Sequence, residues 1–187
     1  LGDVYKRQEL EQLDRHPNVE IRLFNPFVVR SPKAIGYATD FLRLNRRMHN
    51  KSFTADNQVA IIGGRNIGDE YFSARETGLF ADLDVLAVGP AVEAVSEDFD
   101  RYWNSQSAYP AERLLAPPET SRAGALDALV ARTEKDAAAQ AYLQAIRRLP
   151  LIEQIVSGSL PFEWAPVRLI SDDPAKALGR AKACLLY

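Results

Sequence analysis

Residues 46–66 read RRMHNKSFTADNQVAIIGGRN, a pattern of strand, turn, strand and loop. His49 and Lys51 alternate with their neighbours, so an extended strand presents both side chains on one face, roughly 7 Å apart at a rise of about 3.3 Å per residue. The Asp-Asn pair at 56–57 is typical of a turn, and the apolar run 58–62 returns the chain as a second strand. The stretch therefore predicts a hairpin that carries an imidazole and an ammonium group side by side.

The second strand leads into Gly63-Gly64-Arg65-Asn66. Paired glycines let the backbone approach a ligand closely, and the amide of Asn66 can donate to a phosphate oxygen. Lys51 supplies a point charge for the same phosphate, and His49 can act either as the nucleophile or as the acid in phosphodiester transfer. These residue types predict a site for phosphodiester chemistry.

The spacing His-x-Lys, four residues, Asp, six residues, Gly-Gly-x-Asn resembles the HKD motif of the phospholipase D superfamily. The flanking residues 47–54 and 63–72 are most similar to bacterial cardiolipin synthases of the C type, and the similarity runs from about residue 18 to about residue 177. The resemblance implies an α/β fold, a phospholipase D-like mixed β-sheet flanked by helices, in one of two motif-bearing halves. The chain is then an N-terminal-half fragment.

The resemblance also implies a function and a set of site residues. The expected function is that of a phosphatidyltransferase or phosphodiesterase half, which acts on glycerophospholipids through a phosphohistidine in cardiolipin synthesis. The superfamily works without metal, and no cofactor is expected, since two histidines and one cysteine do not cluster in the sequence. The expected catalytic residues are His49, Lys51, Asp56 and Asp82, and the expected phosphate-binding residues are Lys51, Gly64, Asn66 and Arg47.

Two acidic residues, Asp82 and Asp84, open an expected strand at 81–88. Carboxylates at the start of an inner strand need partners, and a catalytic imidazole is one such partner because the carboxylate fixes its tautomer. In the resembled family an acidic residue on the strand after the motif has this task. By position it falls on Asp82.

Composition limits the class of function. The 187 residues are 47% hydrophobic and 26% charged, with a formal net charge of −2, which argues against a nucleic-acid partner. No apolar run approaches the ~20 residues of a membrane span. The sequence has one His-x-Lys, so a second HKD half is expected as a partner, either further along the chain or from a second chain. The resemblance adds an anionic glycerophospholipid, a membrane surface, and a peripheral location at the bacterial inner membrane on either side.

The chain divides by composition into several segments. Residues 9–107 are expected to form the first phospholipase D-like domain, 108–166 a proline-rich linker and helical segment, and 167–183 the start of a second half. Residues 1–8 and 184–187 resemble translated sequencing-adaptor DNA and are expected to be non-native. Strands are expected at 19–24 and 167–170, and a helix begins at Pro90. Its inward stripe is expected to hold Val92, Val95, Phe99, Tyr102 and Trp103.

Two other functions fit the same motif. One is a nuclease or general phosphodiesterase of the same superfamily, against which the balanced charge and the lack of a basic, aromatic-rich stripe both argue. The other is a non-catalytic half that binds anionic phosphates. Pure binding would not need His49 beside Lys51.

Overall fold

The computed structural model describes residues 10–26, 41, 43, 46–66, 82–115 and 124–180. The chain forms two compact units, of which one combines Glu20–Leu115 with Val167–Tyr187 and the other combines Leu1–Val19 with Ala116–Pro166. We call the first the sheet unit and the second the helical unit. The ends 1–8 and 184–187, expected to be non-native, lie outside the described residues.

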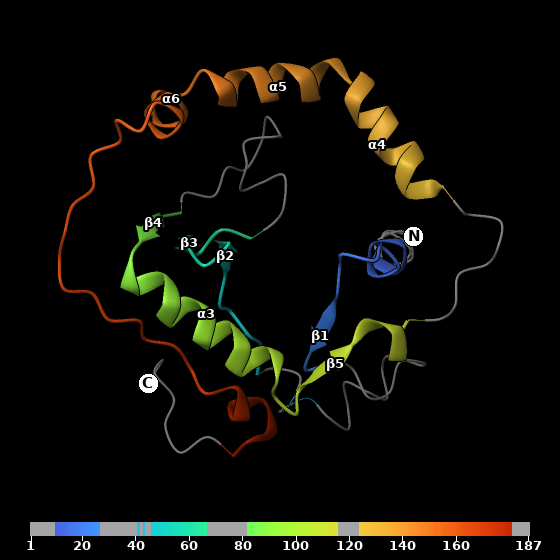
Figure 1. The fold of residues 1–187 in the computed structure, drawn as a ribbon. Helices are drawn as coiled ribbons and strands as arrows, with labels where there is room; N and C mark the ends of the chain where they lie inside the picture. The colour runs from blue at the N-terminus through green and yellow to red at the C-terminus, as the bar shows by residue number, and fades with distance from the viewer. Residues whose placement is uncertain are drawn as a thin grey trace. The chain divides into compact units, whose positions relative to one another are not determined.

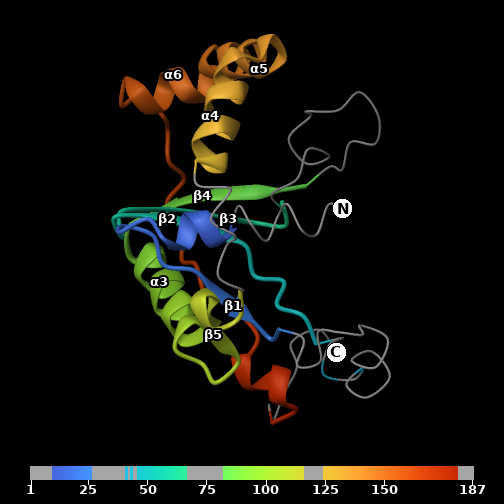
Figure 2. The ribbon, with the colours of Figure 1, turned by 90° about the vertical axis from the view of Figure 1, so that its right-hand side faces the viewer.

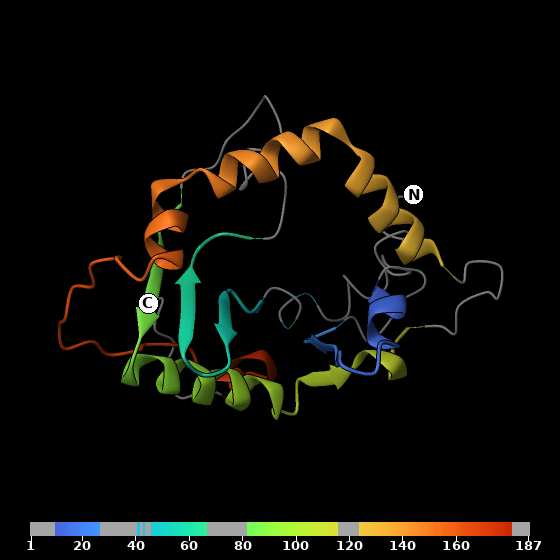
Figure 3. The same cartoon turned by 45° about the horizontal axis from the view of Figure 1, so that its top comes forward.

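The centre of the sheet unit is a three-stranded antiparallel sheet in the order β2-β3-β4 (Figure 3). Its strands are β2 (Ser52–Ala55), β3 (Val59–Gly63) and β4 (Asp84–Val88). The β2–β3 pair is the hairpin that the alternating sequence predicted. In this arrangement the start of β2, the end of β3 and the start of β4 lie at the same end of the sheet.

Helix α3 (Pro90–Trp103) covers one face of this sheet (Figure 2). Ala60 of β3 and Val92 of α3 are fully buried against each other, with Val95 beside them. Proline in the first turn suits the helix start because its missing N–H would have no helical partner there. The helix predicted from Pro90 is confirmed.

The predicted inward stripe of α3 is correct for only part of its length. Val92, Val95 and Tyr102 are buried, whereas Phe99 is 52% exposed and stacks on Trp103 at a ring-centroid distance of 5.4 Å. The prediction that Phe99 is a core residue is therefore wrong. An aromatic pair on the surface of the helix satisfies the same spacing.

A second, two-stranded sheet lies beside the end of α3 (Figure 1). It pairs β1 (Arg22–Phe24) with β5 (Ala108–Pro110), which leads into the short 3₁₀ helix η1 (Ala111–Arg113). The guanidinium of Arg22 joins this sheet to α3, since it donates to the carbonyl of Trp103 at 2.8 Å and lies over its ring. The predicted strand at 19–24 is confirmed only at its last three residues, and the interpretation of 108 onward as a linker was wrong for β5.

The predicted strand at 167–170 is wrong, because these residues have no strand structure. Instead, Leu169 packs against the buried cluster under α3. The chain then forms the short 3₁₀ helix η3 (Pro174–Leu178), which Asp173 caps and which buries Pro174 and Ala177. An apolar, β-branched run becomes a strand only where a neighbouring strand offers a free edge.

The helical unit contains α4 (Ala125–Lys135), α5 (Ala137–Arg147) and α6 (Pro150–Val156). These follow one another closely in the chain (Figure 3), and the carboxylate of Asp136 caps α5. None of the described helices is long and apolar enough to cross a membrane. With antiparallel sheets and flanking helices, the predicted α/β fold class is confirmed.

Candidate active site

His49 lies on the exposed segment that leads into β2. Its ring nitrogen Nδ1 is 3.0 Å from the carbonyl oxygen of Arg47. A carbonyl oxygen only accepts hydrogen bonds, so Nδ1 must carry the proton in this contact. In a neutral imidazole with this contact, the lone pair is on the other ring nitrogen, Nε2, which could attack or take a proton.

Lys51 is half-buried directly before β2. Its carbonyl oxygen accepts from the N–H of Gly63 at 3.2 Å, which fixes it to the end of the hairpin. Its ammonium group donates to the carbonyl oxygen of His49 at 2.8 Å. The regular strand begins at Ser52, so the prediction that His49 and Lys51 both lie in it is wrong, although backbone and side-chain bonds hold Lys51 next to His49.

The two glycines at the end of β3 are each covered by an aspartate from the β4 side. A Cβ atom added at Gly63 would lie 1.9 Å from Oδ1 of Asp84, and one added at Gly64 would lie 2.3 Å from Oδ1 of Asp82. The sequence predicted close approach of a ligand at this point, whereas in the structure two carboxylates make that approach. Arg65 balances one of them, with Nε 2.6 Å from Asp84.

Asp82 does not bond to His49 in this structure. Its Oδ1 accepts from the N–H of Leu83 at 2.9 Å, and the contact that would orient the His49 ring is made by the backbone of Arg47. In the strand order β2-β3-β4, Asp82 directly precedes β4 and His49 precedes β2, so β3 lies between the strands that these two residues lead into. Two strand spacings of about 4.8 Å separate such positions by roughly 10 Å.

Asp56 lies at the opposite end of β2 from Lys51. Asp56 and Asn57 both adopt positive φ, 49° and 54°, and the N–H of Gln58 donates to the carbonyl of Ala55 at 2.9 Å. These are the marks of a type I′ hairpin turn. Five residues of nearly extended chain, at about 3.3 Å each, put Asp56 roughly 16 Å from Lys51, so the structure does not bring Asp56 to the histidine.

Two of the predicted phosphate-binding residues, Lys51 and Gly64, lie at the same end of the hairpin, because the N–H of Gly63 donates to the carbonyl of Lys51. Gly64 and Asn66 follow the last residue of β3, which pairs with Lys51. Arg47 and Asn66 are exposed, and Arg47 also supplies the carbonyl that accepts from His49. The described part of the chain has no group of three His, Cys, Asp or Glu side chains that could hold a metal ion.

Sequence reasoning missed Asn50, which lies between His49 and Lys51. Its side-chain amide donates to Asp98 of α3 at 3.2 Å. The signal was present in the strand alternation, because the residue between two outward-facing side chains is directed to the opposite face. That is the face covered by α3.

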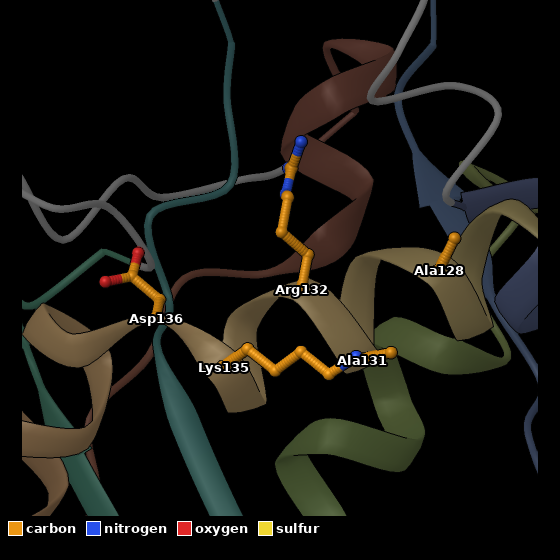
Figure 4. Close-up of a pocket in the computed structure, with 5 residues that line it drawn as sticks. All are labelled: Ala128, Ala131, Arg132, Lys135 and Asp136. Atoms are coloured by element: carbon orange, nitrogen blue, oxygen red, sulfur yellow. The ribbon is translucent and has the colours of Figure 1, made fainter.

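A separate open depression lies on α4 in the helical unit (Figure 4). Its floor is formed by Ala128 and Ala131, and its charged rim by Arg132, Lys135 and Asp136. In Figure 4 the long side chains of Arg132 and Lys135 diverge. The charged groups do not converge on a common point, so the depression does not have the arrangement of a ligand-binding site.

Comparison with known proteins gives three informative relatives. Over 173 residues the chain is 53% identical to cardiolipin synthase C of Escherichia coli (strain K12), an alignment that covers 92% of the chain and 36% of that protein. It is 42% identical over 105 residues to an uncharacterized protein of Helicobacter pylori (strain ATCC 700392 / 26695), covering 54% of the chain and 21% of that protein. It is 40% identical over 68 residues to cardiolipin synthase 1 of Staphylococcus aureus (strain COL), covering 36% of the chain and 14% of that protein.

No family model matches the chain, and no solved structure matches it. The alignment with cardiolipin synthase C of Escherichia coli spans 36% of the length of that protein. Identity of 53% across almost the whole chain confirms the similarity that the HKD spacing predicted. The chain is thus similar to bacterial cardiolipin synthases, in one case across 92% of its length, and its residues 49–66 carry the spacing that resembles the phospholipase D motif.

Proposed function

We propose that a complete protein carrying this chain is a phosphatidyltransferase that makes cardiolipin from glycerophospholipids. One observation carries the proposal: Nδ1 of His49 lies 3.0 Å from the Arg47 carbonyl oxygen and the Lys51 ammonium donates to the His49 carbonyl, in a chain 53% identical over 173 residues to a cardiolipin synthase. An imidazole held in this tautomer is suited to attack phosphorus, and an adjacent cation is suited to the non-bridging oxygens.

The proposed reaction has two steps. In the first, Nε2 of His49 forms a bond to phosphorus, the P–O bond to the leaving alcohol breaks, and an acid protonates the departing oxygen. In the second, the hydroxyl oxygen of an acceptor glycerophospholipid attacks phosphorus, the N–P bond breaks, and the hydroxyl proton passes to a base. Lys51 stabilises the negative charge that builds up on the phosphoryl oxygens in both steps.

Other residues support this chemistry in the proposal. Asn66 and the backbone at Gly64 bind the phosphoryl oxygens, and the guanidinium of Arg47 attracts the anionic headgroup. Asp82 acts on the site through its contact with Gly64. Asp56 shapes the hairpin turn and is a positioning residue.

The proposal includes three partners. A second HKD half supplies the acid and base that a single imidazole cannot provide at the same time as it attacks. The substrate is an anionic glycerophospholipid, and the protein meets it as a peripheral protein at the bacterial inner membrane.

The test is cardiolipin formation in phosphatidylglycerol vesicles by a complete protein, with His49→Ala compared with wild type. Loss of the nucleophile is expected to lower the rate at least about 1,000-fold. His16→Ala is the matched control, because His16 is the other histidine of the sequence and lies in the helical unit. It is expected to leave the rate unchanged.

Other outcomes identify other functions. Wild-type protein that cleaves DNA and leaves lipids unchanged would show a nuclease. Tight phosphate binding without a covalent adduct on His49 would show a non-catalytic binding half. Either outcome would contradict the transferase proposal.

A further inference from the structure

Asn50 connects the motif segment to α3. Its side-chain amide donates to Oδ2 of Asp98 at 3.2 Å, and one helical turn beyond Asp98 the side chain of Tyr102 is buried. Burial raises the pKa of the Tyr102 hydroxyl, which stays protonated and donates to the carbonyl of Asp172 at 2.9 Å. The residue between His49 and Lys51 is therefore tied to the helix beneath the sheet.

Asp98 is shared by three partners. Its Oδ2 accepts from Asn50, while its Oδ1 accepts from the hydroxyl of Ser171 at 2.5 Å and forms an ion pair with Arg101. Only 13% of its side chain is exposed. A largely buried carboxylate with several donors has little freedom to move, because each donor would be left without its acceptor.

The segment 171–179 holds the motif at a second point. A Cβ atom added at Gly179 would lie 2.5 Å from a guanidinium nitrogen of Arg46, so the Arg46 head group rests directly on this glycine. Within the same segment, Asp172 forms an ion pair with Lys176, and Pro174 and Ala177 are buried. Residues far along the chain thus contact both Arg46 and, through Asp98, Asn50.

We infer that Asn50, Asp98 and Ser171 form a brace that positions His49 and Lys51. The brace acts from the α3 side of the sheet, so its members touch neither the imidazole nor the ammonium. Its catalytic consequence rests on the proposed function, whereas its effect on the order of the motif segment does not. A displacement of about 1 Å at a reacting group can lower a rate about 100-fold.

The first test measures hydrogen exchange in the 187-residue chain. The reporter is the backbone N–H of Gly63, which donates to the carbonyl of Lys51. Asn50→Ala and Ser171→Ala are expected to speed its exchange at least tenfold. Two matched controls are expected to leave it unchanged: Asn104→Ala, whose amide donates to the Asp100 carbonyl, and Ser157→Ala, whose hydroxyl donates to the Glu153 carbonyl.

The second test measures cardiolipin formation by a complete protein. Asn50→Ala is expected to lower kcat about 10- to 100-fold with KM within about twofold, because the groups that bind remain while their alignment is lost. Ser171→Thr, which keeps the hydroxyl, is expected to retain activity that Ser171→Ala loses. The losses in Asn50→Ala and Ser171→Ala are expected not to multiply in the double variant, since both act through Asp98.

Each remaining outcome decides the inference. Unchanged exchange at Gly63 in both Asn50→Ala and Ser171→Ala would overturn it, and so would a kcat for Asn50→Ala equal to that of Asn104→Ala. If Asn50→Ala does not fold, Ser171→Ala reaches the same carboxylate from the other side and decides alone. An active His49→Ala protein would contradict the proposed function and leave the exchange test in force.

Discussion

At the scale of single residues, the two glycines after β3 differ in what lies over them. At Gly64 the three nearest atoms to an added Cβ all belong to the side chain of Asp82, at 2.3 to 2.7 Å. At Gly63 the side chain of Asp84 is closest, but the backbone oxygen of Leu83 also lies 2.8 Å away. A side chain can move aside, whereas a sheet backbone cannot.

This difference predicts opposite results for rescue experiments at the two glycines. Gly64→Ala is expected to lower the free energy of unfolding by about 1–3 kcal/mol through overpacking, and Asp82→Ala in the same chain is expected to restore most of the loss. Gly63→Ala is expected to stay destabilised in an Asp84→Ala background, because the Leu83 carbonyl remains. Urea unfolding of the four variants measures this; full rescue at Gly63 would contradict the packing argument.

The proximity of Lys51 to His49 could be predicted from sequence, but the hydrogen-bond partner of the His49 ring could not. His49 and Lys51 are close in the chain, so local geometry is enough to bring them together. Asp82 was expected to orient the imidazole, whereas the described contact is with the backbone of Arg47. A backbone carbonyl carries no residue-specific signal, so no pattern of side chains reveals it.

At the scale of elements, the conformation of the β2–β3 turn gives a structural reason for the acidic motif residue Asp56 that does not require a catalytic role. Asp56 and Asn57 take the left-handed backbone conformation that a type I′ turn requires. Asn57 also accepts a hydrogen bond from Ser96 of α3 at 2.7 Å. The turn therefore sets the register of the hairpin, and the register brings Gly63 opposite Lys51.

Substitution at Asp56 separates a turn role from a catalytic role. Asp56→Gly keeps access to positive φ, so stability and activity are expected to remain near wild type. Asp56→Ala is expected to lower the free energy of unfolding by about 1–2 kcal/mol, since alanine is disfavoured in this conformation. Thermal unfolding and cardiolipin formation measure the two effects. Equal loss of activity in both variants, with both folded, would instead show a catalytic carboxylate.

Elements with local signals were predicted, and those that depend on distant partners were not. The hairpin and α3 follow from alternation, turn residues and a proline start. Strand β5 has three residues, and it forms because β1, which lies much earlier in the chain, pairs with it. Residues 167–170 show the reverse case, since their composition favours a strand but they pack against α3 as irregular chain.

At the scale of the whole molecule, the number of histidines limits what this chain does alone. The sequence has two, and His16 lies in the helical unit whereas His49 lies in the sheet unit. Transfer through a phosphohistidine needs a nucleophile and a separate acid for the leaving alcohol. Within the described residues, one histidine lies two positions from the motif lysine, so in the proposed reaction the chain supplies only one of these two groups.

The 187-residue chain is therefore expected to show little or no turnover as a monomer. The measurement is cardiolipin formation in phosphatidylglycerol vesicles by the monomer fraction from size-exclusion chromatography, beside His49→Ala as the background. Activity that rises with the square of the chain concentration would indicate that two chains build one site. Turnover by the monomer that His49→Ala abolishes would show that this chain supplies its own acid, and the requirement for a second HKD half would be wrong.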